Sequence, residues 1–430
     1  MISQSIKQEL EQYQQQHGTP ARVEVLICDC NAVFRGKWFP GSDLEKLVER
    51  GTNFPLSLLF GDLTCETPSA LLQPPLAGDP DGIYSYVPGS LRAVPWRKQP
   101  TAQIQLSQTI EPGLDPREIL AHIIDRTKFQ GFVALEGEFA VVPHPTVLAG
   151  EQVYSHQALE EAEGFLEPLY AFAKQQSVDL TSVLPEYGPG QFEVNLRHRS
   201  DPLHAADEYL LAKRVTKAAA ESLNKSASFM ALPSSEAAGN GCHIHISFAD
   251  KNGDNLFADE ARMQAAAQGI LANVGDCVAL LAPHANSYRR IDLGGEFNTA
   301  SATWGENHRG VMLRVPKSDP ANRRFEFRLA GADVNPYLLT AFTIAALSEG
   351  MSAGIQPTLP KIAEGSVATI GNPIPARWLQ AIDQLDTSAF ARRHFGDRFI
   401  DTYVRMKRAE ERKFHARVTD LDTAWAAHVV

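Results

Sequence analysis

Three segments of the chain alternate strictly between apolar and polar side chains, which is the pattern of strands with one buried face. The polar members are Glu136 and Glu138 in residues 133–141, His243, His245 and Ser247 in residues 242–248, and Arg324, Glu326 and Arg328 in residues 324–329. The apolar members predict a packed layer behind each strand. Ionisable groups against such a layer are costly unless they are paired, solvated or metal-bound, so the polar faces are predicted to line a cavity.

The first part of the chain has the pattern of a small, β-rich unit. Residues 1–18 predict a polar helix, and residues 22–30 a half-buried, β-branched strand. A short helix is expected from an N-cap at Ser42 to a stop at Gly51. Proline and glycine crowd residues 65–112, which favours loops and edge strands and indicates a domain boundary near residue 110.

A second unit opens with Asp115 as N-cap and Pro116 at the first helical position, and this helix is expected to run to about residue 130. This helix is followed by a strand over residues 132–142, a helix around residues 155–176 and a second strand that ends with residues 191–196. Residues 335–351 predict a mostly buried helix, and the last thirty residues a charged helical segment. The chain is therefore predicted to be α+β, with domains at 1–110 and 111–430.

Composition sets outer limits on these interpretations. A chain of 430 residues with 44% hydrophobic residues can bury a large core in more than one domain. The absence of an 18-residue apolar run or a signal-type apolar region predicts a soluble protein without a membrane partner. Five cysteines without a disulfide framework indicate a reducing, cytoplasmic setting, and a net charge of −11 argues against nucleic acid as a partner.

A fourth segment, residues 186–193, places Glu186 and Glu193 on either side of a Gly-Pro-Gly turn. It completes a candidate metal-ligand set: Glu136, Glu138, Glu186, Glu193, His243 and Glu326. Hard oxygen ligands with few imidazoles favour Mg²⁺ or Mn²⁺ over zinc, and such ions usually serve phosphate chemistry. The matching cations are Arg290, Arg309, Arg314, Arg324 and Arg328. Arginine binds carboxylate and phosphate oxygens bidentately, so a nucleotide and a carboxylate substrate are predicted together.

Each motif alone also fits a simpler interpretation. Glu136 and Glu138 alone would more often form a solvated strand face, and residues 324–328 an exposed strand with salt bridges. A His-x-His pair also occurs in zinc hydrolases. The coincidence of all four segments in one chain favours the metal-dependent site.

The order and spacing of these motifs resemble the glutamine synthetase superfamily. The matching segments are Glu136 to Glu138, Glu186 to Glu193, Gly239 to His245, Asn286 to Arg290, Arg309 to Arg314 and Arg324 to Leu338. The resemblance implies a small N-terminal β-grasp domain and a catalytic domain with a central antiparallel sheet. It also implies a homo-oligomer of stacked rings, usually a dodecamer, with active sites between subunits, and ATP as co-substrate with two divalent metal ions.

The same resemblance implies a role for each candidate residue. One metal would be held by Glu138, Glu186 and Glu193, and the second by Glu136, His243 and Glu326. The nucleotide would contact His245, Ser247, Arg309, Arg314 and Arg324. The acid substrate would contact Gly239, Arg290 and Arg328. Glu296 would help deprotonate the incoming amine, Arg309 would offset charge on the transferring phosphoryl group, and Asp62 would be contributed across a subunit interface.

Departures from the family pattern bear on the substrates. Leu232 stands where the family usually has lysine, Ala238 where it has asparagine, and His308 where it has asparagine. The loop over residues 291–304 also lacks the prolines that are usual in the family's flap. In these respects the chain is more similar to the γ-glutamylpolyamine synthetase branch, which accepts larger amines in place of ammonia. The expected reaction is formation of a γ-glutamyl amide through an acyl phosphate. An ammonia-using glutamine synthetase, a zinc hydrolase using His243 and His245, and a non-catalytic ring-forming relative remain as alternatives.

Overall fold

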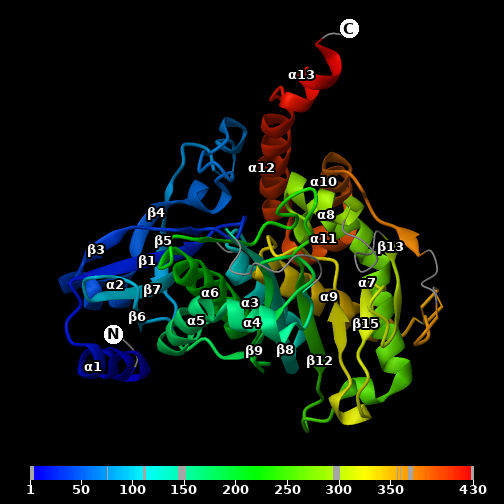
Figure 1. Ribbon diagram of the computed structural model, residues 1–430, viewed down its shortest axis with the longest axis horizontal. Coiled ribbons are helices and arrows are strands. Elements are labelled where there is room, and N and C mark those ends of the chain that lie inside the picture. Colours follow the sequence, from blue (N-terminus) through cyan, green and yellow to red (C-terminus); the bar gives the residue numbers. More distant parts are fainter. Residues whose placement is uncertain are drawn as a thin grey trace.

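The computed structural model describes residues 4–74, 76–109, 113–143, 152–293, 301–355, 357–358, 360–366 and 371–427. The α-helices are α1 (Gln4–His17), α2 (Leu44–Arg50), α3 (Pro116–Thr127), α4 (His156–Glu161), α5 (Glu163–Gln175), α6 (Pro202–Glu221), α7 (Glu260–Leu281), α8 (Ala285–Leu293), α9 (Pro336–Ala353), α10 (Trp378–Thr387), α11 (Ala389–Phe395), α12 (Asp397–His415) and α13 (Asp420–Ala426). Figure 1 shows α12 and α13 projecting from one side of the molecule, with the C-terminus at the tip. The mixture of helices and sheets confirms the predicted α+β class.

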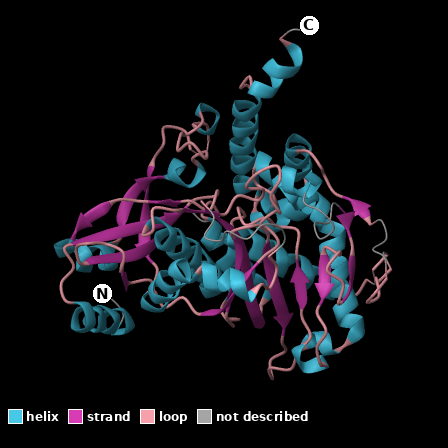
Figure 2. Cartoon of the chain, in the orientation of Figure 1, coloured by secondary structure: helices cyan, strands magenta, loops and turns pink. Residues whose placement is uncertain are grey.

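The strands form two main sheets, which Figure 2 shows as two groups of magenta arrows. The first contains β1 (Arg22–Cys28), β2 (Phe34–Arg35), β3 (Trp38–Pro40), β4 (Thr52–Pro55), β5 (Asp81–Tyr86), β6 (Arg92–Ala93) and β7 (Thr101–Gln108). The second contains β8 (Gly131–Val142), β9 (Leu180–Pro185), β10 (Gln191–Leu196), β11 (Ser226–Ser228), β12 (Cys242–Phe248), β14 (Trp304–Glu306), β15 (Leu313–Val315) and β16 (Phe325–Phe327). A small pair joins β13 (Ser301–Ala302) to β17 (Asn372–Pro373).

The first sheet has the order β2-β1-β7-β5-β4, with β3 added to β1 and β6 added to β7. Strand β7 lies in its middle, pairs parallel with β1, and is buried along its whole length. The prediction of loops and edge strands over residues 65–112 is therefore wrong for this segment. Its polar side chains are buried because they are hydrogen-bonded: Gln105 Nε2 donates to the Tyr337 hydroxyl at 2.7 Å, and Ser107 Oγ to Asp115 at 3.0 Å.

The second sheet has the order β14-β15-β16-β12-β8-β10-β9, with β11 paired to β8, and all its pairs except β14–β15 are antiparallel. Helix α6 packs against the back of β8. A side chain at Gly137 would meet the Tyr209 ring at 2.6 Å, so glycine at that point allows the close approach. The predicted back-face residues Val133, Leu135, Phe139 and Val141 are all buried. The charged face of the sheet is thus turned away from α6.

Several predicted element boundaries are confirmed. Helix α3 has Asp115 as N-cap, whose side chain accepts from the Arg117 backbone N–H at 2.8 Å, and Pro116 in the first turn. The buried helix is α9, and the charged C-terminal segment forms the last part of α12 and α13. The expected helix at 155–176 is two helices, α4 and α5. Helix α2 ends at Gly51 as predicted, but it begins at Leu44, so Ser42 is not its N-cap.

Strand β1 is more deeply buried than the predicted half-buried strand, because all its residues after Arg22 are buried. Its Glu24 is paired with Arg97 at 2.7 Å and with Arg214. The first sheet ends before residue 110 and the second begins after it. The division into two domains there, and the β-grasp identity of the first, stay predictions. None of the described helices combines the length and apolar character needed to cross a bilayer.

Candidate active site

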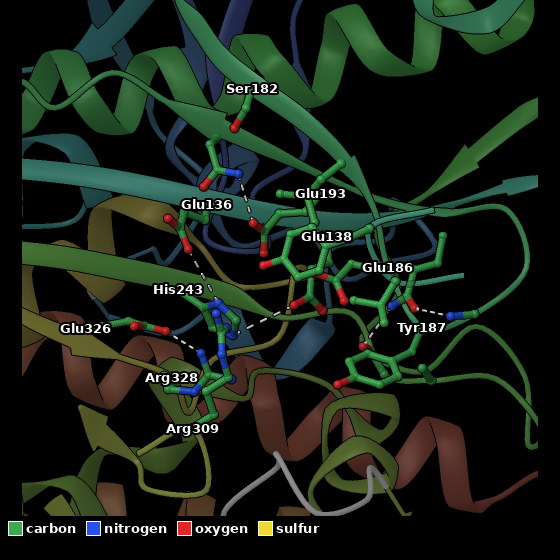
Figure 3. A pocket seen from close by; sticks show the side chains of 18 of the residues that line it. Glu136, Glu138, Ser182, Glu186, Tyr187, Glu193, His243, Arg309, Glu326 and Arg328 are labelled. Atoms are coloured by element: carbon green, nitrogen blue, oxygen red, sulfur yellow. Dashed lines mark hydrogen bonds and ion pairs between the residues drawn. The ribbon is translucent and has the colours of Figure 1, made fainter. Parts of the chain in front are cut away.

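A cavity of about 980 Å³ lies over the charged face of the second sheet. All six predicted metal-ligating residues line it, together with His245, Gly239 and the five predicted arginines. Figure 3 shows Glu136, Glu138, Glu193 and His243 extending from neighbouring strands, with Glu186 from the turn between β9 and β10 and with Arg309 and Arg328 beside them. The volume is in the range of sites for small ligands and cofactors.

Strand pairing accounts for this convergence. His243 lies directly opposite Glu136 in the β12–β8 pair, and Glu193 lies opposite Glu138 in the β10–β8 pair. His245 lies opposite Glu326 in the β12–β16 pair. Because side chains directly opposite one another in an antiparallel pair share a face, the alternation seen in the sequence brings these groups together.

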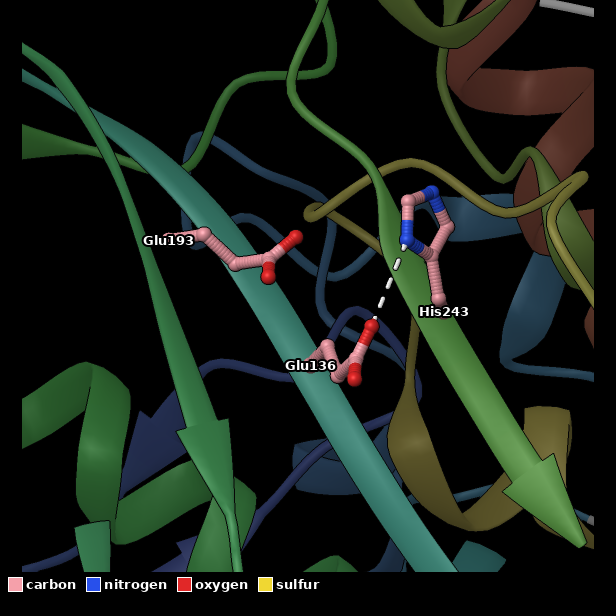
Figure 4. Close-up of side chains that lie close together, drawn as sticks. All are labelled: Glu136, Glu193 and His243. Atoms are coloured by element: carbon pink, nitrogen blue, oxygen red, sulfur yellow. Dashed lines mark ion pairs between the residues drawn. The ribbon is translucent and has the colours of Figure 1, made fainter. Parts of the chain in front are cut away.

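Three groups of side chains place their ligand atoms within 4.8 Å of one another: Glu138 with Glu186 and Glu193; Glu136 with Glu193 and His243; and Glu136 with His245 and Glu326. The first is the predicted set for one metal. The second is shown in Figure 4, where Glu136 and His243 face each other across the two strands. The donor set of carboxylates with one or two imidazoles suits Mg²⁺ or Mn²⁺.

The second predicted set, Glu136, His243 and Glu326, lines the cavity and stays a prediction. The structure groups His245, rather than His243, with Glu136 and Glu326. The reason is register, since His245 is the residue opposite Glu326 and also approaches Glu136 with Nε2 3.1 Å from Oε1. His243 instead lies between the two β8 carboxylates, 3.8 Å from Glu136 and 3.9 Å from Glu138.

Crowding of the carboxylates separates their pKa values. Burial and the neighbouring carboxylates raise the pKa of Glu193 to about 9. Burial and the charge of Glu138 raise the pKa of Glu186 to about 7. Burial alone would also raise the pKa of Glu136, but the nearby His245 and His243 hold it well below its usual range. Bound cations would offset the repulsion that raises the first two values.

The arginines are held next to these acids. Glu326 is nearly fully buried, accepts from Arg314 Nη1 at 2.6 Å, and is paired with Arg328 through its other oxygen. Burial opposes ionisation here, but the arginine and histidine charges lower the pKa of Glu326 to about 2. Arg290 is buried and donates to the Leu329 carbonyl at 2.8 Å. In the described part of the chain, the buried Nε atoms of Arg290, Arg314 and Arg328 have no hydrogen-bond partner, which leaves donors for an anionic ligand.

Gln191 has a structural connection that its sequence position did not reveal. Its Nε2 donates to the Gly239 carbonyl at 3.0 Å and to Asn240 Oδ1 at 2.9 Å, and its Oε1 accepts from the Gly188 N–H at 2.9 Å. It therefore ties the glycine turn before β10 to the loop before β12. Alternation along β10 puts Gln191 on the same face as Glu193, but the loop that it contacts is distant in the sequence.

The structure also adds lining residues that sequence reasoning did not select: Tyr154, Thr181, Ser182, Leu184, Tyr187 and Glu236. They lie in loops or on β9, where no charged alternation marks them. Tyr154 has a positive φ of 57°, an uncommon backbone conformation for a non-glycine residue.

Two predicted residues that the structure describes, Ser247 and Asp62, are not among those that line the cavity. Ser247 is on β12 beyond His245. Asp62 is buried near the first sheet, where it accepts from Lys413 Nζ at 2.7 Å and from Thr64 Oγ1 at 2.7 Å. Its predicted contribution across a subunit interface stays a prediction. Glu296 lies outside the described residues.

Comparison with known proteins gives a consistent result. Residues 113–426 match the model of the glutamine synthetase catalytic domain. The chain is 32% identical over 446 residues to gamma-glutamylputrescine synthetase of Escherichia coli, covering 97% of this chain and 94% of that protein. It is 32% identical over 429 residues to gamma-glutamylethanolamide synthetase of Streptomyces coelicolor, covering 93% of this chain and 90% of that protein.

A glutamate–isopropylamine ligase of a Pseudomonas species is 26% identical over 364 residues, covering 78% of this chain and 79% of that protein. Among solved structures, apo GmaS without ligand aligns with a TM-score of 0.84 at 22% identity, covering 100% of both chains, which supports the fold. The chain therefore belongs to the glutamine synthetase family and is a carbon–nitrogen ligase.

Proposed function

We propose that the protein joins the γ-carboxylate of glutamate to an amine, with ATP as the energy source and a γ-glutamyl phosphate as intermediate. The observation that supports this best is the shared cavity, which combines grouped glutamates suited to divalent cations with arginines suited to phosphate and carboxylate. A ligase of this type needs both functions within reach of one another, because the phosphoryl group is transferred directly to the acid.

The residues present fit two divalent cations, Mg²⁺ or Mn²⁺. Glu138, Glu186 and Glu193 would hold one ion. The second would be held by Glu136, Glu326 and an imidazole: His243 in the assignment from family resemblance, or His245 in the grouping that the structure has. Such ions supply charge neutralisation on the phosphates and the transferring phosphoryl group.

The arginines have separate proposed partners. Arg309, Arg314 and Arg324, with His245 and Ser247, bind the nucleotide. Arg290 and Arg328, with Gly239, bind the acid substrate. Arg309 lies near Glu186 and stabilises charge on the transferring phosphoryl group.

The reaction is written in two displacement steps. An oxygen of the γ-carboxylate attacks the γ-phosphorus of ATP, and the bond to the β-phosphate oxygen breaks to release ADP. The amine nitrogen then attacks the acyl carbon, the carbon–oxygen bond to phosphate breaks, and the amine loses a proton, with Glu296 as the proposed acceptor. Water must be kept out between the two steps because it would hydrolyse the acyl phosphate.

The amine is proposed to be larger than ammonia, either a polyamine or a monoamine. This rests on the departures at Leu232, Ala238 and His308 and on the relatives named for putrescine, ethanolamide and isopropylamine products or substrates. We further propose a cytoplasmic homo-oligomer of stacked rings in which Asp62 serves a neighbouring subunit's site.

Phosphate release with glutamate, ATP and Mg²⁺ tests the proposal. It should require putrescine, spermidine or a monoamine, and mass spectrometry should find the corresponding γ-glutamyl amide. Equal efficiency with ammonia alone would identify an ordinary glutamine synthetase instead, a function carried by relatives at 25–27% identity. Intact assembly without phosphate release for any amine would indicate a non-catalytic relative.

A further inference from the structure

A second, smaller cavity of about 150 Å³ lies between the first sheet and α6, and the proposed reaction does not use it. Its walls are β1, β6, β7 and the loop between β5 and β6 on one side, and α3 and α6 on the other. Among the described residues, this cavity and the one over the second sheet have no lining residue in common. Four of its lining residues are exposed and mark its opening to solvent: Pro88, Gly89, Asp201 and His204. Since it is smaller than the roughly 300–1,000 Å³ of sites for drug-sized molecules, it suits a ligand of few atoms.

A buried amide in the wall of this cavity has an oxygen without a partner. Gln103 lies on β7 and is only 1% exposed. In the part of the chain that the structure describes, its Oε1 accepts no hydrogen bond. A buried acceptor in this state is unfavourable, and few such atoms remain in folded proteins. Gln103 therefore offers an acceptor to a ligand that carries an N–H or O–H group.

A guanidinium group lies beside that amide. Arg92 is directly opposite Gln103 in the β6–β7 pair, so the two side chains share the face of the sheet that borders the cavity. Arg92 donates through Nε to the Gln176 carbonyl at 2.7 Å and through Nη1 to the Gly89 carbonyl at 2.8 Å. Within the described ranges it forms no ion pair with a carboxylate, and its Nη2 donates no hydrogen bond. Burial lowers the pKa of Arg92, and an anion in contact with it would oppose that shift.

The buried carboxylates of the cavity already have cationic partners. Asp207 is paired with Arg117, which also lines the cavity, at 3.0 Å. Glu208 is paired with Arg199 at 2.7 Å. These pairs cancel one another, so Arg92 is the charge of the interior that is left without a counter-charge. The interior of the cavity therefore favours a ligand with one negative charge.

We propose that this cavity binds a small carboxylate with one negative charge and one hydroxyl group, an α-hydroxy acid of two or three carbons. The carboxylate accepts from Arg92, and the hydroxyl donates to Gln103 Oε1. Because Arg92 and Gln103 are neighbours across one strand pair, a ligand whose two groups are one carbon apart matches their spacing. A small amino acid also carries a donor beside its carboxylate, but it has no net charge to balance Arg92.

Calorimetric titrations of the full chain with glycolate, acetate and glycine test this assignment, because acetate lacks the donor and glycine lacks the net charge. The wild type should bind glycolate about tenfold more tightly than either of the other two. Gln103→Met keeps the shape of the side chain and should weaken glycolate binding by roughly five- to a hundredfold, while acetate binding stays within about twofold. Arg92→Met should weaken the binding of both anions by at least about tenfold. Gln99→Met, at an exposed position in the segment before β7, is the matched control and should change none of these affinities.

Thermal unfolding separates a lost ligand contact from a lost fold. The Tm of Gln103→Met without ligand should equal or exceed that of the wild type, because the substitution removes a buried oxygen that has no partner. Glycolate binding that is unchanged in both Gln103→Met and Arg92→Met would overturn the proposal, since it would place the anion elsewhere on the protein. A wild type that binds acetate or glycine as tightly as glycolate, or binds none of the three, would also overturn it. The titrations contain no nucleotide or amine, so their outcome is independent of the proposed ligase reaction.

Discussion

Arg314 and Glu326 face each other across neighbouring strands, with Arg314 Nη1 2.6 Å from Glu326 Oε2. Arg328 is paired with the other oxygen of the same carboxylate. Glu326 therefore has a guanidinium on each oxygen before any cation or nucleotide is considered. A ligand that binds at this end of the cavity has to share or exchange these contacts, which links Arg314, proposed to bind the nucleotide, to the proposed metal ligand Glu326.

Replacing Arg314 by alanine should lower kcat for amine-dependent phosphate release by roughly 10²–10³-fold, the range seen when one preorganised transition-state donor is removed. Arg314→Lys keeps the charge but loses the fork geometry, so its kcat should lie between those of the wild type and Arg314→Ala. Initial rates at saturating ATP measure the effect. Arg377→Ala, at a largely exposed side chain, is the control; a similar rate loss there, or none in Arg314→Ala, would refute the assignment.

Metal binding should be linked to proton release. Burial and neighbouring carboxylates raise the pKa of Glu186 to about 7 and of Glu193 to about 9, so both carboxyls are largely protonated at pH 6. Since a cation binds the ionised form, Mn²⁺ affinity should increase from pH 6 to pH 9 and level off above it. Calorimetry in buffers of different ionisation enthalpy counts the released protons. Glu193→Gln should release fewer protons when Mn²⁺ binds. A Mn²⁺ affinity that does not change with pH would contradict the prediction.

A buried ion pair within α12 is hydrogen-bonded to Asn31, in the loop after β1, and should dominate local stability. Lys407 has no exposed surface, donates to Glu410 at 2.8 Å, and also donates to Asn31. Lys407→Met should lower the free energy of unfolding by about 3–5 kcal/mol, because it leaves a buried carboxylate without its cation. Urea denaturation measures the loss.

The double variant Lys407→Met/Glu410→Met is the control for that mechanism. It removes both charges, so it should be more stable than the single variant. If the second substitution instead added a further loss of similar size, the unpaired charge would not be the cause.

The N-cap of α3 gives a separate stability test. Asp115 accepts from the Arg117 and Gln108 backbone N–H groups, both at 2.8 Å, and from Ser107 Oγ at 3.0 Å. Asp115→Ala should cost about 1–2 kcal/mol or more, since it removes the cap and leaves buried donors unpaired. Asp115→Asn retains an acceptor and should cost less. Thermal unfolding midpoints that rank the two variants in the opposite order would rule out capping as the cause.

Much of the site could be predicted because it is built from strand alternation, which is a local property. Glu136 and Glu138 share a face whatever the rest of the chain does, and the apolar residues on either side of them along the strand indicate which face is charged. The grouping of His245 with Glu326 could not be predicted in this way, because it depends on the register between β12 and β16. The position of Gln191 against Asn240 depends on a loop contact and is equally non-local.

The fold shows the same division between local and non-local information. The cap at Asp115 and the stop at Gly51 are read from a few adjacent residues, and both are confirmed. Strand β7 was missed as a central strand because its glutamines and serine are polar by type. Only partners distant in the sequence, such as Tyr337, make their burial favourable.

Pairing of β8 with β12 and β10 on its two sides also limits how this region can change by mutation. His243 and Glu193 meet the glutamates of β8 only in one register, and that same register buries Val133, Leu135 and Phe139 against the helices. Deleting a single residue in the middle of β8 would turn its glutamates inward and its apolar residues outward. Substitutions can alter the candidate ligands one at a time, but a one-residue change in the length of β8 would disrupt both the buried apolar layer and the grouping of its glutamates with His243 and Glu193.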